Sequence, residues 1–237
     1  RDLHKEYRRQ RQMCIRDRFN KTEVLELISK TQMIAVVRAS EPEKALKLGE
    51  AAVKAGVIAV EITATVPSYD KVVTQLQANF GNTAVVGVGS ILSTKQIEIA
   101  LDAGAQFIVT PAVSTDLVIA NYLTESVFII GALTPSEILY AEHLGADLVK
   151  VFPVNAVGGI SYIKSILEPM PWLKLVPTGG VNFDNFVSFI HAGATCVGLG
   201  SSLFPKQLVQ DENWEEIRRH IAKFVVRLSE ARDNSGV

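Results

Sequence analysis

The sequence has few of the residues that build disulfide frameworks and zinc sites. Its 237 residues include only two cysteines, Cys14 and Cys196, which are too few and too far apart for either arrangement. No apolar run approaches the roughly 18 residues that suggest a membrane-spanning helix. A formal net charge of -1 gives no support for a nucleic-acid or anionic-membrane partner. We therefore expect a soluble, cytoplasmic protein with neither kind of partner.

The first 18 residues lack the patterning of the rest of the chain. Residues 1–18 are strongly basic and have no sustained apolar face. A basic arm for nucleic acid is one interpretation. The stretch 13–18, MCIRDR, also resembles translated sequencing-adapter read-through. We favour the second interpretation, treat residues 1–18 as a non-native or disordered extension, and expect a single domain over residues 19–237.

From residue 19 onward, short apolar runs alternate with helical patterns. A lead-in helix is predicted over residues 19–30 and a last helix over about 213–232. Alternating strands and helices indicate a parallel sheet, and eight units predict a (β/α)8 barrel. An open doubly wound sheet is the alternative, but residues 87–92 lack the third glycine of a dinucleotide fingerprint, so no NAD is expected. The eight predicted strands are Met33–Arg38, Ile58–Thr63, Ala84–Gly89, Phe107–Thr110, Val127–Ile130, Leu148–Phe152, Leu175–Pro177 and Cys196–Gly198.

Lys150 interrupts a run that otherwise has the composition of a buried strand. A parallel strand covered by helices is normally almost continuously apolar, so this lysine must lose its hydration there. Loss of hydration disfavours the ammonium form, and a neutral amine attacks carbonyl groups to form Schiff bases. The alternatives are a lysine whose amine reaches water at the end of the strand, and a solvated strand edge.

Alternation along the strands predicts that further polar side chains lie beside Lys150. In the second strand the aliphatic residues share one face, whereas Glu61 and Thr63 share the other, which we expect to face the barrel interior. Arg38 stands at the end of the first strand. Barrel active sites lie at the carboxyl ends of the strands, so Arg38, Glu61 and Lys150 are predicted to meet at one mouth. Glu61 could instead be a structural partner of Lys150, and Arg38 a helix cap or a solvated side chain. A buried ion pair adds little net stability, which favours a functional role.

Two glycine-rich segments follow the last two strands. Thr178-Gly179-Gly180 comes after the seventh strand and Gly200-Ser201 after the eighth. Loops in these places form the common phosphate site of barrels, because glycine lets backbone N–H groups approach an anion. Ordinary tight turns are the alternative.

These residues together resemble the 2-keto-3-deoxy-6-phosphogluconate (KDPG) aldolase family, which also includes 4-hydroxy-2-oxoglutarate aldolases. The likeness extends from about Ile34 to Ala222. The matching segments, in order, are Val60–Thr63, Gly87–Ser90, Phe107–Pro111, Thr134–Glu137, Val149–Pro153, Pro177–Gly180 and Gly198–Ser201.

The resemblance implies a class I aldolase that uses no metal or cofactor and is commonly a homotrimer. It makes Lys150 the Schiff-base lysine and Glu61 the general acid and base. Thr63, Ser90 and Thr178 are the candidates to bind the pyruvyl carboxylate; Ser90 occupies a position that is usually threonine. The remaining predicted substrate-binding residues are Arg38, Pro111, Phe152, Gly179, Gly180, Gly200 and Ser201.

One departure concerns the substrate. Some members carry an arginine just after the strand of the catalytic glutamate, where this chain has Ala64-Thr65. Arg38 is the candidate to supply that positive charge. The expected reaction is cleavage of KDPG, and of 4-hydroxy-2-oxoglutarate as a further substrate, to pyruvate and an aldehyde. The alternatives are a 2-keto-3-deoxy-6-phosphogalactonate aldolase and a non-catalytic barrel that binds an anion. A metal-dependent epimerase is disfavoured because no histidine falls on a predicted strand.

Overall fold

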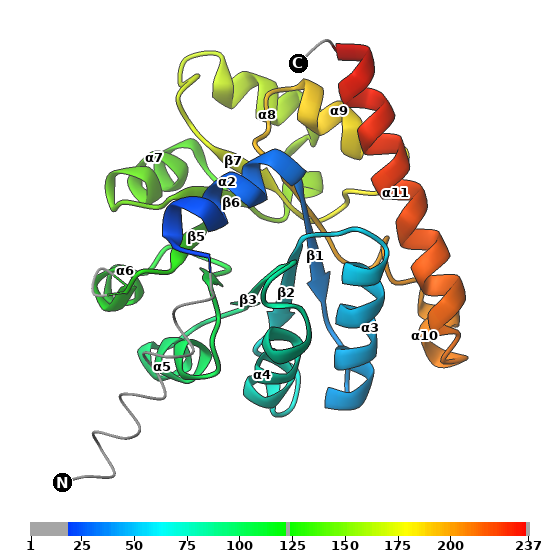
Figure 1. Cartoon of the computed structure of the whole chain (residues 1–237). Helices are drawn as coiled ribbons and strands as arrows, with labels where there is room; N and C mark the ends of the chain where they lie inside the picture. The colour runs from blue at the N-terminus through cyan, green and yellow to red at the C-terminus, as the bar shows by residue number, and fades with distance from the viewer. Residues whose placement is uncertain (1–18, 122–123, 236–237) are drawn as a thin grey trace, which may run out of the picture.

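The computed structural model describes residues 19–121 and 124–235 and arranges them around one eight-stranded sheet (Figure 1). Each strand is short, and every strand residue except the half-buried Val36 of β1 is buried, as expected of parallel strands covered by helices. The strands are β1 (Met33–Val37), β2 (Ala59–Thr63), β3 (Val85–Gly89), β4 (Phe107–Val109), β5 (Val127–Ala132), β6 (Leu148–Val151), β7 (Leu175–Pro177) and β8 (Val197–Leu199).

The sheet closes on itself as a barrel. Its strands follow the order β7-β6-β5-β4-β3-β2-β1-β8, and every neighbouring pair is parallel. A parallel bridge between Thr178 and Gly198 joins β7 to β8. The predicted (β/α)8 barrel is confirmed, and the alternative of an open doubly wound sheet is wrong.

Helices connect the strands and surround them (Figure 1). Start signals in the sequence form as expected at α7, where the Thr134 side chain and Glu137 make a complete capping box. Within the described part of the chain, no helix is long and apolar enough to cross a membrane. The helices are α2 (Lys21–Thr31), α3 (Pro42–Lys54), α4 (Tyr69–Phe80), α5 (Thr94–Asp102), α6 (Thr115–Asn121), α7 (Pro135–His143), η1 (Val154–Val157), α8 (Ile160–Leu167), α9 (Phe186–His191), α10 (Lys206–Gln210) and α11 (Trp214–Ser235).

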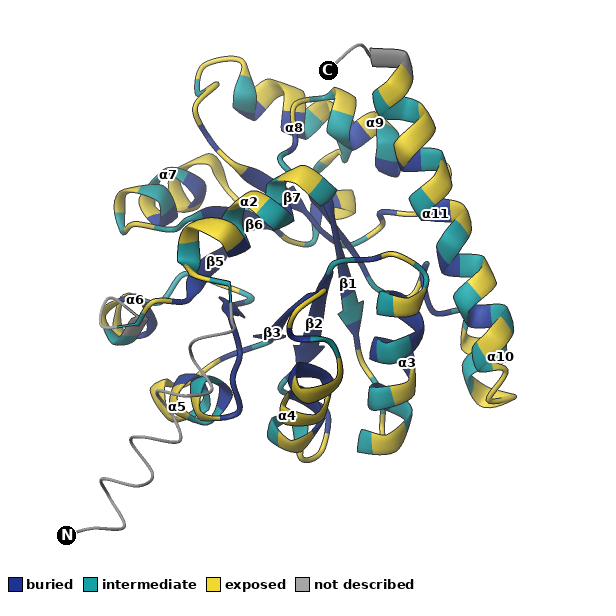
Figure 2. Ribbon diagram, viewed as in Figure 1, coloured by how far each residue is buried: buried dark blue, intermediate teal, exposed yellow. Residues whose placement is uncertain are grey.

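Apolar side chains form two separate clusters, one outside and one inside the barrel. The outer cluster joins the outward faces of the strands to the helices and includes Val60, Ile62 and Val149. The inner cluster includes Ala59 and Leu148, which alternate with those residues along the same strands. Figure 2 shows the strands buried at the centre while the helices turn exposed faces outward. The predicted parity of β2 and β6 is therefore confirmed.

Helix α2 packs against the inner cluster at the amino ends of the strands. Val24 and Ile28 are buried and belong to the same cluster as the interior residues of the barrel. Lys21 adds an ion pair of 2.8 Å to Asp147, just before β6. The lead-in helix thus fills one end of the barrel with apolar side chains. The predicted extension over residues 1–18 lies outside the described residues.

Candidate functional site

Lys150 and Glu61 face each other inside the carboxyl end of the barrel. Lys150 Nζ lies 3.7 Å from Glu61 Oε1, and the two residues are 7% and 2% exposed. This distance is that of an ion pair and is longer than a hydrogen bond. Glu61 Oε1 is buried and has no hydrogen-bond partner among the residues that the structure describes. A buried carboxylate oxygen without a hydrogen bond is costly, and such groups concentrate where a protein performs chemistry.

Two glycines, one on a strand next to β2 and one on a strand next to β6, allow close packing at this end of the barrel. Gly89 lies on β3 beside Thr63, and a Cβ there would overlap Oε1 and Cδ of Glu61. Gly131 lies on β5 directly opposite Lys150, and a Cβ there would overlap the backbone of Pro111. Gly89 therefore leaves room for the Glu61 carboxylate, and Gly131 leaves room for the Pro111 backbone beside Lys150.

Hydroxyl groups lie at the ends of β2 and β3, next to the pair. Thr63 is fully buried, and its Oγ1 is 2.8 Å from Thr65 Oγ1. Ser90 follows β3 with a φ of 59°, a left-handed conformation that is uncommon for a residue other than glycine. Such strain persists only where the surrounding structure enforces it, and it is frequent at ligand sites.

Three predicted residues lie at the rim of the mouth. Phe152 comes just after the end of β6, is 40% exposed, and has its ring centroid 5.5 Å from Lys150 Nζ. Pro111 is half-buried against Gly131. Arg38 follows β1 and is exposed. The structure gives no hydrogen bond or ion pair for the Arg38 guanidinium within the described residues, so neither a cap nor a salt bridge accounts for it.

The loop after β7 packs against the segment after β6. Thr178 is buried, and its Oγ1 occupies the space that a Cβ at Gly198 would need. Gly179 and Gly180 have φ values of 87° and 79°, which only glycine adopts readily. Asn155 N donates to the Gly179 carbonyl at 3.3 Å, which ties the two segments together.

The loop after β8 is a tight turn. Leu203 N donates to the Gly200 carbonyl at 3.0 Å, so that Ser201 and Ser202 occupy the centre of the turn. Ser201 is exposed, and Ser202 Oγ donates to the Val181 carbonyl at 2.9 Å. The two glycine-containing loops are therefore neighbours, joined by a hydrogen bond, at the end of the barrel that also holds Lys150.

The cysteine and histidine side chains of the described residues do not lie beside the Lys150–Glu61 pair. Cys196 is enclosed in the inner apolar cluster, and burial raises the pKa of its thiol, which keeps it protonated. His143 lies on α7, His191 on α9 and His220 on α11. No group of three or more His, Cys, Asp or Glu residues that could hold a metal ion occurs in residues 19–121 and 124–235. In this structure, Lys150 is the nucleophilic side chain that the barrel directs to its carboxyl end.

Fold and site together define a (β/α)8-barrel protein with a buried lysine–glutamate pair where the strands end. The family model described as KDPG and KHG aldolase matches residues 24–220, and the chain belongs to this family. It is accordingly an aldolase, a carbon–carbon lyase.

Individual relatives agree with this assignment. The 2-dehydro-3-deoxy-phosphogluconate aldolase of Haemophilus influenzae is 28% identical over 204 residues, covering 86% of this chain and 95% of the relative. The 2-dehydro-3-deoxy-6-phosphogalactonate aldolase of Escherichia coli is 30% identical over 177 residues, covering 74% and 86%. A crystal structure of KDPG aldolase from Legionella pneumophila, with pyruvate captured as a covalent carbinolamine, superposes with a TM-score of 0.77 at 30% identity. That superposition covers 84% of this chain and 96% of that one.

The sequence pattern predicts the charged residues of the site but not the glycines that allow close packing around it. Gly89, Gly131 and Gly198 each interrupt or end a strand, and a glycine within a strand often marks a close approach of other groups. The sequence therefore contained a signal for these close approaches. The hydrogen bond from His220 to the carbonyl of Ser202 had no such signal, because it joins a helix to a loop 18 residues away.

Proposed function

We propose that the protein is a class I aldolase that cleaves KDPG to pyruvate and an aldehyde through a Schiff base on Lys150. The observation that carries this proposal is the buried pair of Lys150 and Glu61, 3.7 Å apart at the carboxyl ends of β6 and β2. A nucleophilic amine needs a neighbouring base to take its proton, and the pair places both groups within reach of one substrate atom.

The reaction begins when Lys150 Nζ, having passed a proton to Glu61, attacks the C2 ketone of the substrate. The carbonyl π electrons move to oxygen, and a proton passes from the nitrogen to that oxygen, directly or through one water, to give a carbinolamine. Glu61, directly or through one water, returns a proton to the departing hydroxyl, and loss of water leaves an iminium. Proton transfer by a positioned carboxyl group typically contributes about 10²- to 10⁴-fold to the rate.

Cleavage follows when Glu61 accepts the proton of the C4 hydroxyl. The C3–C4 bond breaks, its electrons move toward the iminium nitrogen, and the aldehyde leaves. Protonation of the resulting enamine at C3 and attack of water on the iminium release pyruvate and the free lysine. The iminium on Lys150 accepts the electrons of the broken C3–C4 bond, and Glu61 transfers the protons. In this scheme these two residues carry out the reaction.

Polar groups around the pair position the two halves of the substrate. Thr63, Ser90 and Thr178 bind the pyruvyl carboxylate, and Phe152 and Pro111 limit the mouth. The loops with Gly179, Gly180, Gly200 and Ser201 hold the distal phosphate, with Arg38 as a further cation at the rim. Holding both ends of the substrate places C2 against the amine, which is a large source of rate enhancement.

Borohydride reduction in the presence of pyruvate tests the proposal directly. Mass spectrometry of the digested protein should find a reduced pyruvyl adduct on Lys150. Absence of an adduct on the protein, or an adduct on another lysine, would contradict the mechanism. The same trap also excludes the alternative of a non-catalytic anion-binding barrel, which would form no adduct.

A second substrate, 2-keto-3-deoxy-6-phosphogalactonate, is favoured by one observation. The Escherichia coli relative named for it is 30% identical. The two substrates differ in configuration at C4, so kcat/KM measured on both, and on unphosphorylated 4-hydroxy-2-oxoglutarate, identifies the preferred one.

We further propose that the protein assembles as a homotrimer. Large apolar side chains are exposed on successive elements at one side of the barrel: Leu92 before α5, Ile119 on α6 and Tyr140 on α7. Exposed apolar groups gathered on one side suit contact with a second copy. Light scattering after size exclusion measures the mass directly, and a monomer at micromolar concentration would contradict the proposal.

A further inference from the structure

The turn after β8 is held by three hydrogen bonds from different parts of the chain. Leu203 N closes the turn onto Gly200 O at 3.0 Å. Ser202 Oγ donates to Val181 O at 2.9 Å, which links the turn to the loop after β7. His220, on α11, places its Nε2 2.8 Å from Ser202 O. The last of these bonds connects the loops at the mouth to a helix that lies outside the barrel.

The imidazole of His220 has a defined donor role. Its partner is a carbonyl oxygen, which can only accept, so Nε2 carries the hydrogen whether the ring is neutral or charged. The ring also packs edge-on against Phe224, with centroids 5.4 Å apart and planes at 67°. Phe224 is fully buried in the outer core, so α11 fixes the orientation of the imidazole.

Both loops direct their carbonyl groups toward donors of the protein. Gly179 O accepts from Asn155 N, and Gly180 O accepts from the Asn185 side chain at 3.0 Å. Thr178 O accepts from Val154 N at 2.9 Å. With the Val181, Gly200 and Ser202 carbonyls already described, six carbonyl groups in segments 178–181 and 200–202 are engaged. By contrast, no hydrogen bond within the described residues uses the N–H of Gly180 or Ser201. Loops arranged in this way offer N–H groups and withhold carbonyl oxygens, which is what an anion requires.

We propose that His220 is a positioning residue for the phosphate-binding loops. It acts through Ser202, holding the carbonyl of the turn away from the anion and keeping the turn attached to α11. The inference rests on the proposed function of these loops. Without the imidazole donor, the Ser202 peptide can rotate and present its negative end to the phosphate. The cost falls on binding of the phosphorylated end of the substrate and leaves the chemistry at Lys150 unchanged.

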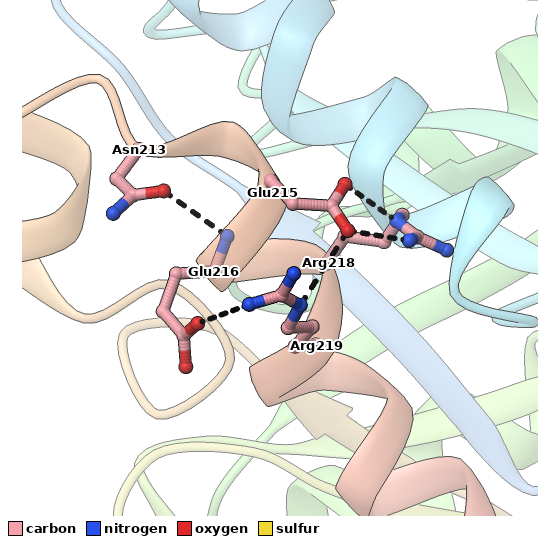
Figure 3. A network of polar contacts seen from close by, with 5 residues as sticks. All are labelled: Asn213, Glu215, Glu216, Arg218 and Arg219. Carbon is pink, nitrogen blue, oxygen red and sulfur yellow. Dashed lines mark hydrogen bonds and ion pairs between the residues drawn. The ribbon is translucent and has the colours of Figure 1, made fainter.

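Two substitutions separate the hydrogen bond from the packing of the ring. His220→Leu keeps an apolar side chain beside Phe224 and removes the donor, whereas His220→Gln supplies an amide N–H at a similar reach. Arg219→Gln is the matched control. Figure 3 shows the Arg219 guanidinium paired with Glu215 and Glu216 of its own helix. The two ion pairs measure 3.5 and 3.4 Å, and the Arg219 side chain is 64% exposed.

The measurements are the Kd for inorganic phosphate by calorimetry and KM and kcat for KDPG and for unphosphorylated 4-hydroxy-2-oxoglutarate. One hydrogen bond contributes a factor of up to roughly tenfold. We expect His220→Leu to raise the phosphate Kd and the KM for KDPG by about that factor. Its kcat, its KM for the unphosphorylated substrate and its trapping by pyruvate and borohydride should stay at wild-type values. His220→Gln should restore most of the phosphate affinity, and Arg219→Gln should resemble the wild type throughout.

Two results would overturn the inference. One is wild-type phosphate affinity in His220→Leu; the other is an equal loss on both substrates, which would indicate a general structural role. Failure of the proposed aldolase function would be seen separately: in that case the wild-type protein would give no pyruvate adduct with borohydride. The Kd for inorganic phosphate, compared between the wild type and His220→Leu, would still decide whether His220 supports an anion site.

Discussion

The interior of this barrel is apolar at its amino end and polar at its carboxyl end, and the change occurs within two residues of the same strand. On β2, Ala59 lies in the inner apolar cluster, whereas Glu61 is charged. On β6, Leu148 and Lys150 repeat the pattern. Helix α2 covers the amino end with buried side chains such as Ile28. The amino end of the barrel interior thus contributes to stability, and the carboxyl end carries the reactive groups. Substitutions at the two ends should therefore have separable effects.

Lys150→Met at the carboxyl end should have the largest effect on activity. Cleavage should fall below detection and the pyruvate adduct should disappear, because methionine has no amine. The variant should also lose stability, since breaking a buried pair leaves an unpaired charge at a cost of about 3–5 kcal/mol. Urea unfolding measures this loss. Retained trapping would show that another amine reacts.

The double variant Glu61→Gln/Lys150→Met sharpens that result. Replacing both members of a buried pair by uncharged groups is often neutral or stabilising by about 1–4 kcal/mol. We expect the double variant to be inactive and at least as stable as the parent. A double variant less stable than Lys150→Met would mean that the pair contributes to folding, which would break the division between the two ends.

Gly89→Ala should have the next largest effect on activity. The added Cβ overlaps the Glu61 carboxylate and forces it out of its position. Because such a group contributes about 10²- to 10⁴-fold, kcat should fall within that range. The control is Gly49→Ala on α3, where the Cβ would lie 2.8 Å from the flexible end of Leu76, far from the mouth. Equal losses of kcat in the two variants would refute the role given to Gly89.

The sequence was sufficient to predict which strand residues face inward. Period-two alternation directs Glu61 and Lys150 away from Val60 and Val149, and closure of the barrel brings the two inward side chains together. Their distance could not be predicted, since it depends on the register between strands. The same register makes Gly89 the residue that lies across from Thr63 and admits Glu61.

The position of the lead-in helix was equally hidden. Val24 and Ile28 form an apolar stripe that would suit any covering position on the protein. The closed barrel has apolar side chains exposed at its amino end, and Val24 and Ile28 of α2 pack against them. The link from His220 to Ser202 could not be predicted for the same reason, because it joins elements that only the closed fold brings together.

Ile28→Ala at the amino end should lower stability and leave activity unchanged, unlike the variants at the carboxyl end. Removing most of a fully buried side chain typically costs about 2–5 kcal/mol of unfolding free energy. Activity at 25 °C should stay at the wild-type value while the protein remains folded. Glu26→Ala, an exposed position on the same helix, should change stability by no more than about 0.5 kcal/mol. A loss of kcat/KM in folded Ile28→Ala would show that the two ends are coupled.

Ser90 should give the smallest effect, and two variants divide its contributions. Ser90→Ala and Ser90→Gly both remove the hydroxyl, so each should lower kcat/KM by about 2- to 12-fold, the value of one hydrogen bond. Only glycine relieves the φ of 59°. Glycine also makes the unfolded chain more flexible, which offsets roughly 0.5–1 kcal/mol of the relief. Ser90→Gly should therefore equal or exceed Ser90→Ala in unfolding free energy at matched activity. If Ser90→Gly were instead the less stable variant, the strain at this position would be negligible, and the left-handed turn would follow from the loop rather than from a constraint imposed by the site.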